Sequence, residues 1–338
     1  MKKLRLSALA TGVEVAALAL AGCGGGSSST SGDAVSGSDG ATTDTTGDKP
    51  YVAIVSKGFQ HQFWQAVKTG ADQAAEEFGV TVTFEGPDSE ADVDQQIQQL
   101  QTALDKNPQA IGFAALDSQA ATPLLQQAEA AGIPIIAFDS GVDSEIPVTT
   151  ASTDNKAAAA EAAKQMAEGI NHEGKVAMVV HDQTSVTGQD RRYGFKDYME
   201  QNEPKIEIVD IQYGGGDQAK SADLTKAILA AHPDLKGIYG SNEGSAIGVV
   251  QGVKETGISD GELIVVGFDS GKAQIDAIRN GLMYGAITQN PVGMGYETVK
   301  AAVEAIEGKE LPKTIDTGFF WYTKDNIDTD EIKAVIYE

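Results

Sequence analysis

The chain has 338 residues, a formal net charge of -24 at pH 7 and a single cysteine. So acidic a chain is not expected to bind nucleic acid or anionic lipid through its own surface, and one cysteine excludes a disulfide within the chain. About 290 residues follow a low-complexity start, a length that suits two domains of ordinary size, each stabilised by its hydrophobic core.

The first segment, 1–22, is predicted to be a signal peptide. It opens with three basic residues, Lys2, Lys3 and Arg5. A short apolar run follows, and it ends in Leu-Ala-Gly-Cys at Cys23. This ending resembles the bacterial lipobox, which implies a lipid on Cys23 and a new N-terminus there. Glu14 interrupts the apolar run and is expected to slow processing. The alternative is an ordinary secretory signal with an incidental cysteine. A spanning helix is disfavoured because the run is shorter than about 20 residues.

The segment 23–50 is predicted to be the lipidated cysteine and a flexible linker. It reads CGGGSSSTSGDAVSGSDGATTDTTGDKP and has no aromatic residue. Such a composition buries too little apolar surface to offset the entropy of ordering the backbone. We expect it to hold a folded body at a distance from a membrane.

From Tyr51 onward, apolar runs alternate with segments of helical periodicity. Predicted strands are 52–56, 80–84, 110–115, 133–138, 176–180, 206–211, 237–241, 263–268 and 285–289. Predicted helices are 63–78, 93–104, one ending at Ala131, 156–170, 191–200, 219–231, 244–255 and 272–280. The strands are apolar throughout, as strands buried on both faces are, and helical crossovers imply parallel pairing. The sequence therefore predicts an α/β fold with two Rossmann-like lobes, because one sheet would hold too many strands.

Polar side chains follow many of these strands at their carboxyl ends. They are Ser56, Asp117, Asp139, His181, Asp182, Asn242, Glu243, Asp269 and Gln289. Ligands of open α/β sheets lie beyond these ends, so the set predicts a polar cleft between the lobes. The alternative for any one of them is a helix cap, since Asp and Asn are favoured there.

Four segments resemble the ribose-type periplasmic sugar-binding proteins. They are ASTDN (151–155), RRYGF (191–195), AAHPDLKGIYGSNE (230–243) and VVGFDS (265–270). The resemblance runs from Tyr51 to near the C-terminus. It implies two lobes joined by a hinge of three crossings, with an N-terminal lobe of 51–153 plus 290–318. The C-terminal lobe would hold 154–289 plus 319–338.

The resemblance also implies contact residues. In the first binding loop, SKGFQHQFW, His61 takes the polar position and Phe63 and Trp64 the aromatic pair. The other implied contacts are Asp139, Arg191, Asn242, Asp269 and Gln289, and His181 is a weaker candidate. Asp accepts, Arg donates through a fork, Asn and Gln do both, and rings cover the C–H face of a sugar.

The chain also departs from the ribose receptors. Ser140 stands where they have a second arginine, and Gly214–Gly216 replace an aromatic residue. Phe59 is predicted to compensate as a second stacking ring. These departures argue against ribose itself, and they leave the choice of monosaccharide open.

The resemblance implies an extracytoplasmic lipoprotein that delivers a monosaccharide to the permease of an ABC importer. We expect a monomer with no cofactor, no metal site and no catalytic step, anchored on the outer face of the cytoplasmic membrane. One alternative is a sugar-sensing receptor that feeds a membrane kinase or chemoreceptor. Another is a secreted glycosidase with Asp139 and Asp269 as paired carboxylates. A LacI-type repressor is disfavoured because a signal and linker replace the DNA-binding headpiece.

Overall fold

The computed structural model describes residues 49–258 and 261–337. The predicted signal peptide, Cys23 and nearly all of the linker lie outside this range. In the described part, no helix combines the length and the apolar character needed to cross a membrane.

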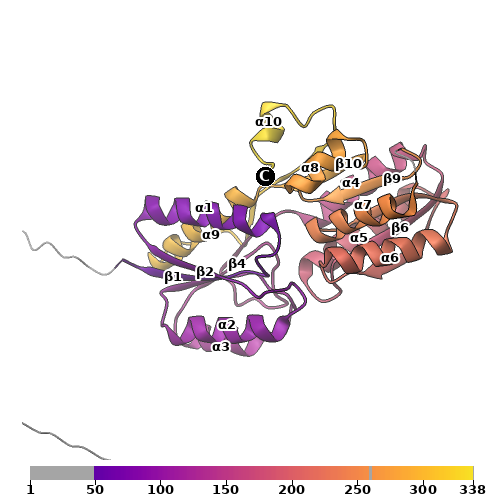
Figure 1. Cartoon of the computed structure of the whole chain (residues 1–338). Helices are drawn as coiled ribbons and strands as arrows, with labels where there is room; N and C mark the ends of the chain where they lie inside the picture. The colour runs from indigo at the N-terminus through magenta and orange to yellow at the C-terminus, as the bar shows by residue number, and fades with distance from the viewer. Residues whose placement is uncertain (1–48, 259–260, 338) are drawn as a thin grey trace, which may run out of the picture. The chain divides into compact units, whose positions relative to one another are not determined.

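The first sheet has six parallel strands in the order β11-β5-β4-β3-β1-β2. Its strands are β1 Tyr51–Val55, β2 Thr81–Glu85, β3 Ala110–Phe113, β4 Ile135–Phe138, β5 Thr149–Ser152 and β11 Thr314–Asp316. Helices α1 (Gln62–Phe78) and α9 (Pro291–Ile306) cover one face, and α2 (Val93–Asp105) and α3 (Thr122–Ala130) cover the other (Figure 1). We call this half the first lobe.

The second sheet also has six strands, in the order β12-β10-β9-β8-β6-β7. Its strands are β6 Gly174–Val180, β7 Ile206–Tyr213, β8 Leu235–Gly240, β9 Ile264–Phe268, β10 Gly285–Gln289 and β12 Phe319–Tyr322. One face carries α4 (Asn155–Gly169) and α5 (Val186–Asn202). The other carries α6 (Gln218–Ala231), α7 (Glu243–Thr256) and α8 (Lys272–Arg279). This half, the second lobe, confirms the predicted α/β fold with two lobes.

One strand departs from the predicted parallel pairing, because β12 runs antiparallel to β10. The chain leaves β11 of the first sheet at Asp316 and enters β12 of the second at Phe319. Gly318, with φ of 77°, lies in this short link. Because β11 ends at the carboxyl edge of the first sheet, the short link brings the chain to the carboxyl edge of the second sheet, and β12 therefore runs opposite to the strands that it joins.

The chain passes between the two sheets at three places. These are between β5 and α4, between β10 and α9, and between β11 and β12. After β12, a loop leads to the short helix α10 (Asp330–Lys333). Ile332 packs in the core of the second lobe, whereas Tyr337, within the segment expected in that lobe, packs in the core of the first.

Candidate binding site

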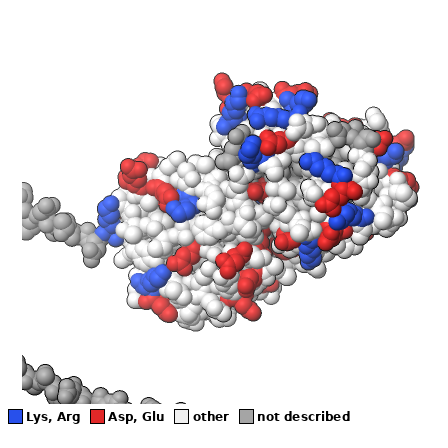
Figure 2. Space-filling model, in the orientation of Figure 1, with Lys and Arg blue, Asp and Glu red and all other residues white. Residues whose placement is uncertain are grey.

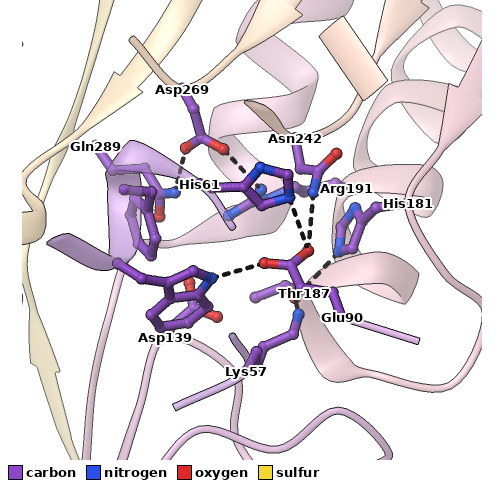
Figure 3. Close-up of a pocket in the computed structure, with 12 residues that line it drawn as sticks. Lys57, His61, Glu90, Asp139, His181, Thr187, Arg191, Asn242, Asp269 and Gln289 are labelled. Atoms are coloured by element: carbon purple, nitrogen blue, oxygen red, sulfur yellow. Dashed lines mark hydrogen bonds and ion pairs between the residues drawn. The ribbon is translucent and has the colours of Figure 1, made fainter. Parts of the chain in front are cut away.

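A pocket lies where the carboxyl ends of the two sheets face each other (Figure 3). The cavity between its side chains is about 20 Å³. The lining residues are Lys57, His61, Phe63, Trp64, Glu90, Asp139, His181, Thr187, Arg191, Asn242, Asp269 and Gln289. A cavity of this volume has room for about one water molecule, so the lining side chains have to move apart before a larger molecule can enter.

Eight of the nine residues expected to touch a ligand line this pocket. The exception is Phe59, whose ring packs edge-on against Phe84 with the centroids 5.5 Å apart. The apolar ring of Phe84 on β2 gives Phe59 a partner outside the pocket. Lys57, Glu90 and Thr187 line the pocket without having been predicted.

Two aspartates occupy equivalent positions in the two lobes. Asp139 follows β4 in the sequence IIAFDS, and Asp269 follows β9 in VVGFDS. Their φ angles are 53° and 80°, in the left-handed region that few residues other than glycine adopt. The backbone N–H of each donates to a neighbouring strand end, to Ala151 O at 3.0 Å and to Ile287 O at 2.6 Å. Strained backbone of this kind is typical of functional sites.

Asp269 is held by its neighbours. Its Oδ1 accepts from Gln289 Nε2 at 2.7 Å, and its Oδ2 accepts from the backbone N–H of Glu243 at 2.8 Å. Arg191 Nη1 lies 4.0 Å from Oδ2. Burial nevertheless raises the pKa of Asp269, and Arg191 and Gln289 oppose that effect.

Asp139 has a less satisfied carboxylate. No described residue donates a hydrogen bond to it, although its side chain is buried. Burial raises its pKa to about 6, against the opposing charges of Lys57 and Arg191. A buried carboxylate with free acceptor oxygens can receive hydrogen bonds from a hydroxylated ligand.

Arg191 comes from α5 and lies flat in the pocket. Its Nε donates to Asn155 Oδ1 at 2.7 Å and its Nη1 donates to Ser241 O at 3.0 Å. The guanidinium also stacks on the ring of Phe268, 3.7 Å from the centroid. These contacts fix the orientation of the guanidinium through Nε and Nη1.

Glu90 joins three other pocket residues across the two lobes. Its Oε1 accepts from Trp64 Nε1 at 2.7 Å, and its Oε2 accepts from Asn242 Nδ2 at 3.0 Å (Figure 3). His61 Nε2 lies 3.6 Å from Oε2. Burial alone would raise the pKa of Glu90, but His61 and then Lys57 lower it well below its usual range.

His61 is therefore a buried cation. Burial disfavours its charge, yet Glu90, Glu243 and Asp269 together raise its pKa to about 9. Neither ring nitrogen has a hydrogen-bond partner among the described residues, and the same holds for Gln289 Oε1. Such buried polar atoms are costly unless a partner satisfies them, and a polar ligand could do so.

Two further basic residues lie at the pocket floor, and one of them, Lys57, links the lobes. Lys57 Nζ donates to Thr187 Oγ1 at 3.0 Å and lies 3.9 Å from Asp182. His181 Nδ1 lies 2.8 Å from Ser241 Oγ, and burial lowers the pKa of this imidazole, so it is neutral. Lys57, His61 and Arg191 thus face Glu90, Asp139 and Asp269 in the lining, and the carboxylates of Asp182 and Glu243 lie just behind it.

Phe63 and Trp64 are the apolar wall of the pocket. Both are buried at the start of α1, and their rings meet edge-on with centroids 4.9 Å apart. Both aromatic residues expected from the sequence therefore reach the pocket. In the described residues, no three or more His, Cys, Asp or Glu side chains group so as to hold a metal ion.

The family model described as "Periplasmic binding protein domain" matches residues 52–310. The chain belongs to this family. The family is one of binding proteins, which confirms the expectation of a receptor rather than an enzyme, and its members act outside the cytoplasm. The resemblance to ribose-type periplasmic sugar-binding proteins is also confirmed.

Several relatives of this periplasmic binding protein are known. The D-allose-binding periplasmic protein of Escherichia coli K12 is 29% identical over 269 residues, which are 77% of this chain and 86% of that protein. An ABC transporter solute-binding protein from Agrobacterium vitis with bound D-fucose is similar in structure. Its TM-score is 0.82 at 33% identity, over 85% of this chain and all of that one. A solute-binding protein from Agrobacterium radiobacter in complex with D-arabinose has a TM-score of 0.82 and 29% identity, over 86% of this chain and 99% of the other.

Proposed function

We propose that this periplasmic binding protein captures a neutral monosaccharide between its lobes and delivers it to an ABC importer. The observation that carries the proposal is the pocket itself. It combines three buried carboxylates, a fixed guanidinium, two planar amides and two aromatic rings within one small space. Relatives are named for allose and ribose, and similar structures hold fucose, tagatose or arabinose.

Ligand capture requires both lobes. Asp139 and Trp64 come from the first lobe, whereas Arg191, Asn242 and Asp269 come from the second. Only closure brings both sets to one ligand, so binding would favour the closed state. We propose the predicted lobe boundaries, with 51–153 plus 290–318 in the first lobe and 154–289 plus 319–338 in the second, except that Tyr337 near the C-terminus packs in the core of the first.

The test is a thermal-shift screen of the protein against pentoses, hexoses, deoxyhexoses and polyols. A sugar at 100 times its dissociation constant should stabilise the fold by about 2.7 kcal/mol. Sugar phosphates and amino acids are the controls, and they should give no shift because burying their charged groups costs more than burying neutral hydroxyls. If only charged compounds shift the melting temperature, the proposal is wrong.

Variants of Asp269 test whether the sugar binds in this pocket or elsewhere on the protein. Asp269→Ala should abolish the sugar-induced shift, because it removes the acceptor that orients Gln289 and borders Arg191. Asp269→Asn keeps the side-chain volume and should weaken binding less. Circular dichroism of the unliganded variants checks that they fold. Tight binding by a folded Asp269→Ala protein would place the ligand elsewhere.

We further propose that the protein acts as a monomer held on the outer face of the membrane by lipid on Cys23. The basic start, the apolar run and the Leu-Ala-Gly-Cys ending support this. Metabolic labelling with a fatty acid in a bacterial host should mark the wild-type chain, and Cys23→Ala should remove the label and release the protein. A labelled Cys23→Ala chain, or an unlabelled wild-type chain, would instead indicate an ordinary secretory signal.

A further inference from the structure

Two helices that border the cleft have no side-chain cap in their own lobe. Helix α1 begins after His61, whose side chain makes no capping hydrogen bond. Helix α8 begins after Gly271, which has no side chain to offer. Among the other described helices, α3 begins after Ala121 and also has no side-chain cap, whereas seven are capped from their own N-cap position, by Asp92, Asp154, Ser185, Asp217, Asn242, Asn290 and Thr329.

Helices α1 and α8 each receive their cap from the opposite lobe. Glu243, at the start of α7 in the second lobe, accepts from the first backbone N–H groups of α1. Its Oε1 accepts from Gln62 N and its Oε2 from Phe63 N, both at 3.0 Å. In return, the Gln62 side chain accepts from Lys272 N of α8 at 2.7 Å. A carboxylate at a helix N-terminus also gains from the helix dipole.

Two glycines, Gly271 and Gly244, lie where the two lobes come into contact. A Cβ on Gly271 would lie 2.9 Å from Glu243 Cδ and 3.0 Å from Gln62 Oε1. A Cβ on Gly244 would lie 2.7 Å from His61 Cε1. Glycine at both places lets the capping side chains and the opposite backbone approach.

Glu243 is connected to the ligand pocket without lining it. Its backbone N–H donates to Asp269 Oδ2 at 2.8 Å, and its side chain is buried against α1. Opening the lobes would return its carboxylate and three backbone N–H groups to water. Because water replaces such bonds at small net cost, the contacts bias the equilibrium without locking it.

We propose that Glu243 and Gln62 form a reciprocal latch, in which each lobe caps a helix of the other and thereby sets the fraction of closed protein. This inference rests on the proposed function in one respect: closure is taken to be the state that binds sugar. The latch residues would then tune affinity as positioning residues, since apparent affinity scales with the competent fraction.

The primary test uses ligand-free protein, so it does not depend on the sugar. Spin labels on Gln126→Cys in α3 and Lys220→Cys in α6, in a full chain with Cys23→Ser, report the distance between lobes by pulsed electron paramagnetic resonance. Both positions are exposed. Glu243→Ala and Gln62→Ala should each lower the ratio of closed to open protein about 2- to 30-fold, which corresponds to the free energy of one helix cap. Glu243→Gln should fall between, because it keeps an acceptor and loses the charge.

The matched control is Asp92→Ala, which removes the cap of α2 within its own lobe, a hydrogen bond from Gln95 N of 2.9 Å. It should lower stability and leave the distance distribution unchanged. Unchanged distances in both Glu243→Ala and Gln62→Ala would overturn the latch.

A second measurement uses the tightest binder among D-allose, D-ribose, D-arabinose, D-fucose and D-tagatose. Calorimetry should show its affinity falling by the same factor as the closed fraction. If none of these sugars binds, the proposed ligand class fails, and the distance measurement still decides the latch.

Discussion

Individual pocket residues are kept charged or neutral by their surroundings. Glu90 is charged because His61 and Lys57 face it, whereas Asp139 has no hydrogen bond to offset its burial. Two carboxylates of one pocket, those of Glu90 and Asp139, thus have pKa values shifted in opposite directions. The direction of each pKa shift shows which buried carboxylate lowers the stability of the folded protein when it is charged, namely Asp139.

The first prediction concerns Asp139. Its folded-state pKa of about 6 exceeds the usual 3.8, so its contribution to stability falls as the pH rises through that interval. Asp139→Asn removes this cost and should stabilise the ligand-free protein at pH 8 by about 1–3 kcal/mol, with no gain below pH ~4. Urea unfolding at the two pH values measures it.

The same substitution should weaken sugar binding, because an amide replaces two acceptor oxygens by one. Asp117→Asn is the control: it also follows a strand, but its carboxylate caps the turn through Gln119 and Ala120. Asp117→Asn should change neither the affinity for sugar nor the difference in stability between the two pH values. An Asp139→Asn protein less stable than wild type at pH 8 would contradict the prediction.

The second prediction concerns His61. Its pKa of about 9 means that the imidazole is charged at pH 7, and the stability from its charge is present below 6.5 and lost as the pH rises through about 9. Glu90→Gln should bring the pKa below 6.5, because burial then outweighs the remaining carboxylates. The nitrogen chemical shifts of the His61 imidazole, followed by NMR across pH 5–10, give its pKa in the wild type and in the Glu90→Gln variant. A wild-type pKa near 6.5 would refute the buried pair.

Residues that end a strand could be placed from the sequence at the edge where the pocket lies. Asp139, Asn242, Asp269 and Gln289 follow apolar runs that locate the cleft edge. Glu90 was missed because it lies in a loop between β2 and α2, with no periodic pattern that places it. Phe59 was misplaced because sequence alone does not show that Phe84 lies beside it.

At the scale of elements, the first lobe depends on a close crossing of α1 and α9. A Cβ on Gly70 would lie 1.8 Å from Val292 O, and one on Gly295 would lie 1.9 Å from Val67 O. The two helices therefore meet backbone to backbone. Because α1 begins with His61, Phe63 and Trp64 at the pocket, this crossing also positions the pocket wall.

The third prediction tests that crossing. Gly70→Ala should destabilise the protein by about 1–3 kcal/mol, because the added methyl forces the helices apart. Gly141→Ala serves as the control, since its Cβ would meet only Thr150 Cγ2 at 3.9 Å. Chemical denaturation compares the two, and equal stabilities would show that α9 moves away at no cost.

The elements that the sequence pattern missed differ in character: β12, which reads FFWY, is apolar and yet was not predicted, whereas others lack an apolar run. β5 reads TTAS and β11 reads TID, which are short and polar, so neither stands out as an apolar run. α9 begins with proline and has glycines at Gly293 and Gly295, which weakens its helical signal although it is buried. Each is stabilised by neighbours distant in sequence, which a local pattern does not contain.

At the scale of the molecule, surface and pocket differ in charge. The chain carries a net charge of -24, and on the face drawn in Figure 2 acidic and basic side chains are interspersed. The charged side chains of the pocket, in contrast, are buried. Long-range attraction should therefore contribute little to capture of a neutral ligand.

The fourth prediction follows from the burial of the charged side chains in the pocket. Between 50 and 500 mM sodium chloride, the dissociation constant of the sugar identified in the screen should change less than about twofold, because salt screens exposed charges far more than buried ones. Isothermal titration at several salt concentrations measures it. A tenfold loss of affinity at high salt would indicate a charged ligand.

The three passages between the sheets affect how this chain acquires its structure. Helix α9 and strand β11 complete the first lobe, yet they lie between residues 291 and 316, after the whole second sheet except β12. A ribosome releases the amino-terminal end first, and domains made of one continuous segment can fold as they emerge. Here neither half has all its strands until almost the entire polypeptide is synthesised, so folding to completion is postponed to the end of synthesis.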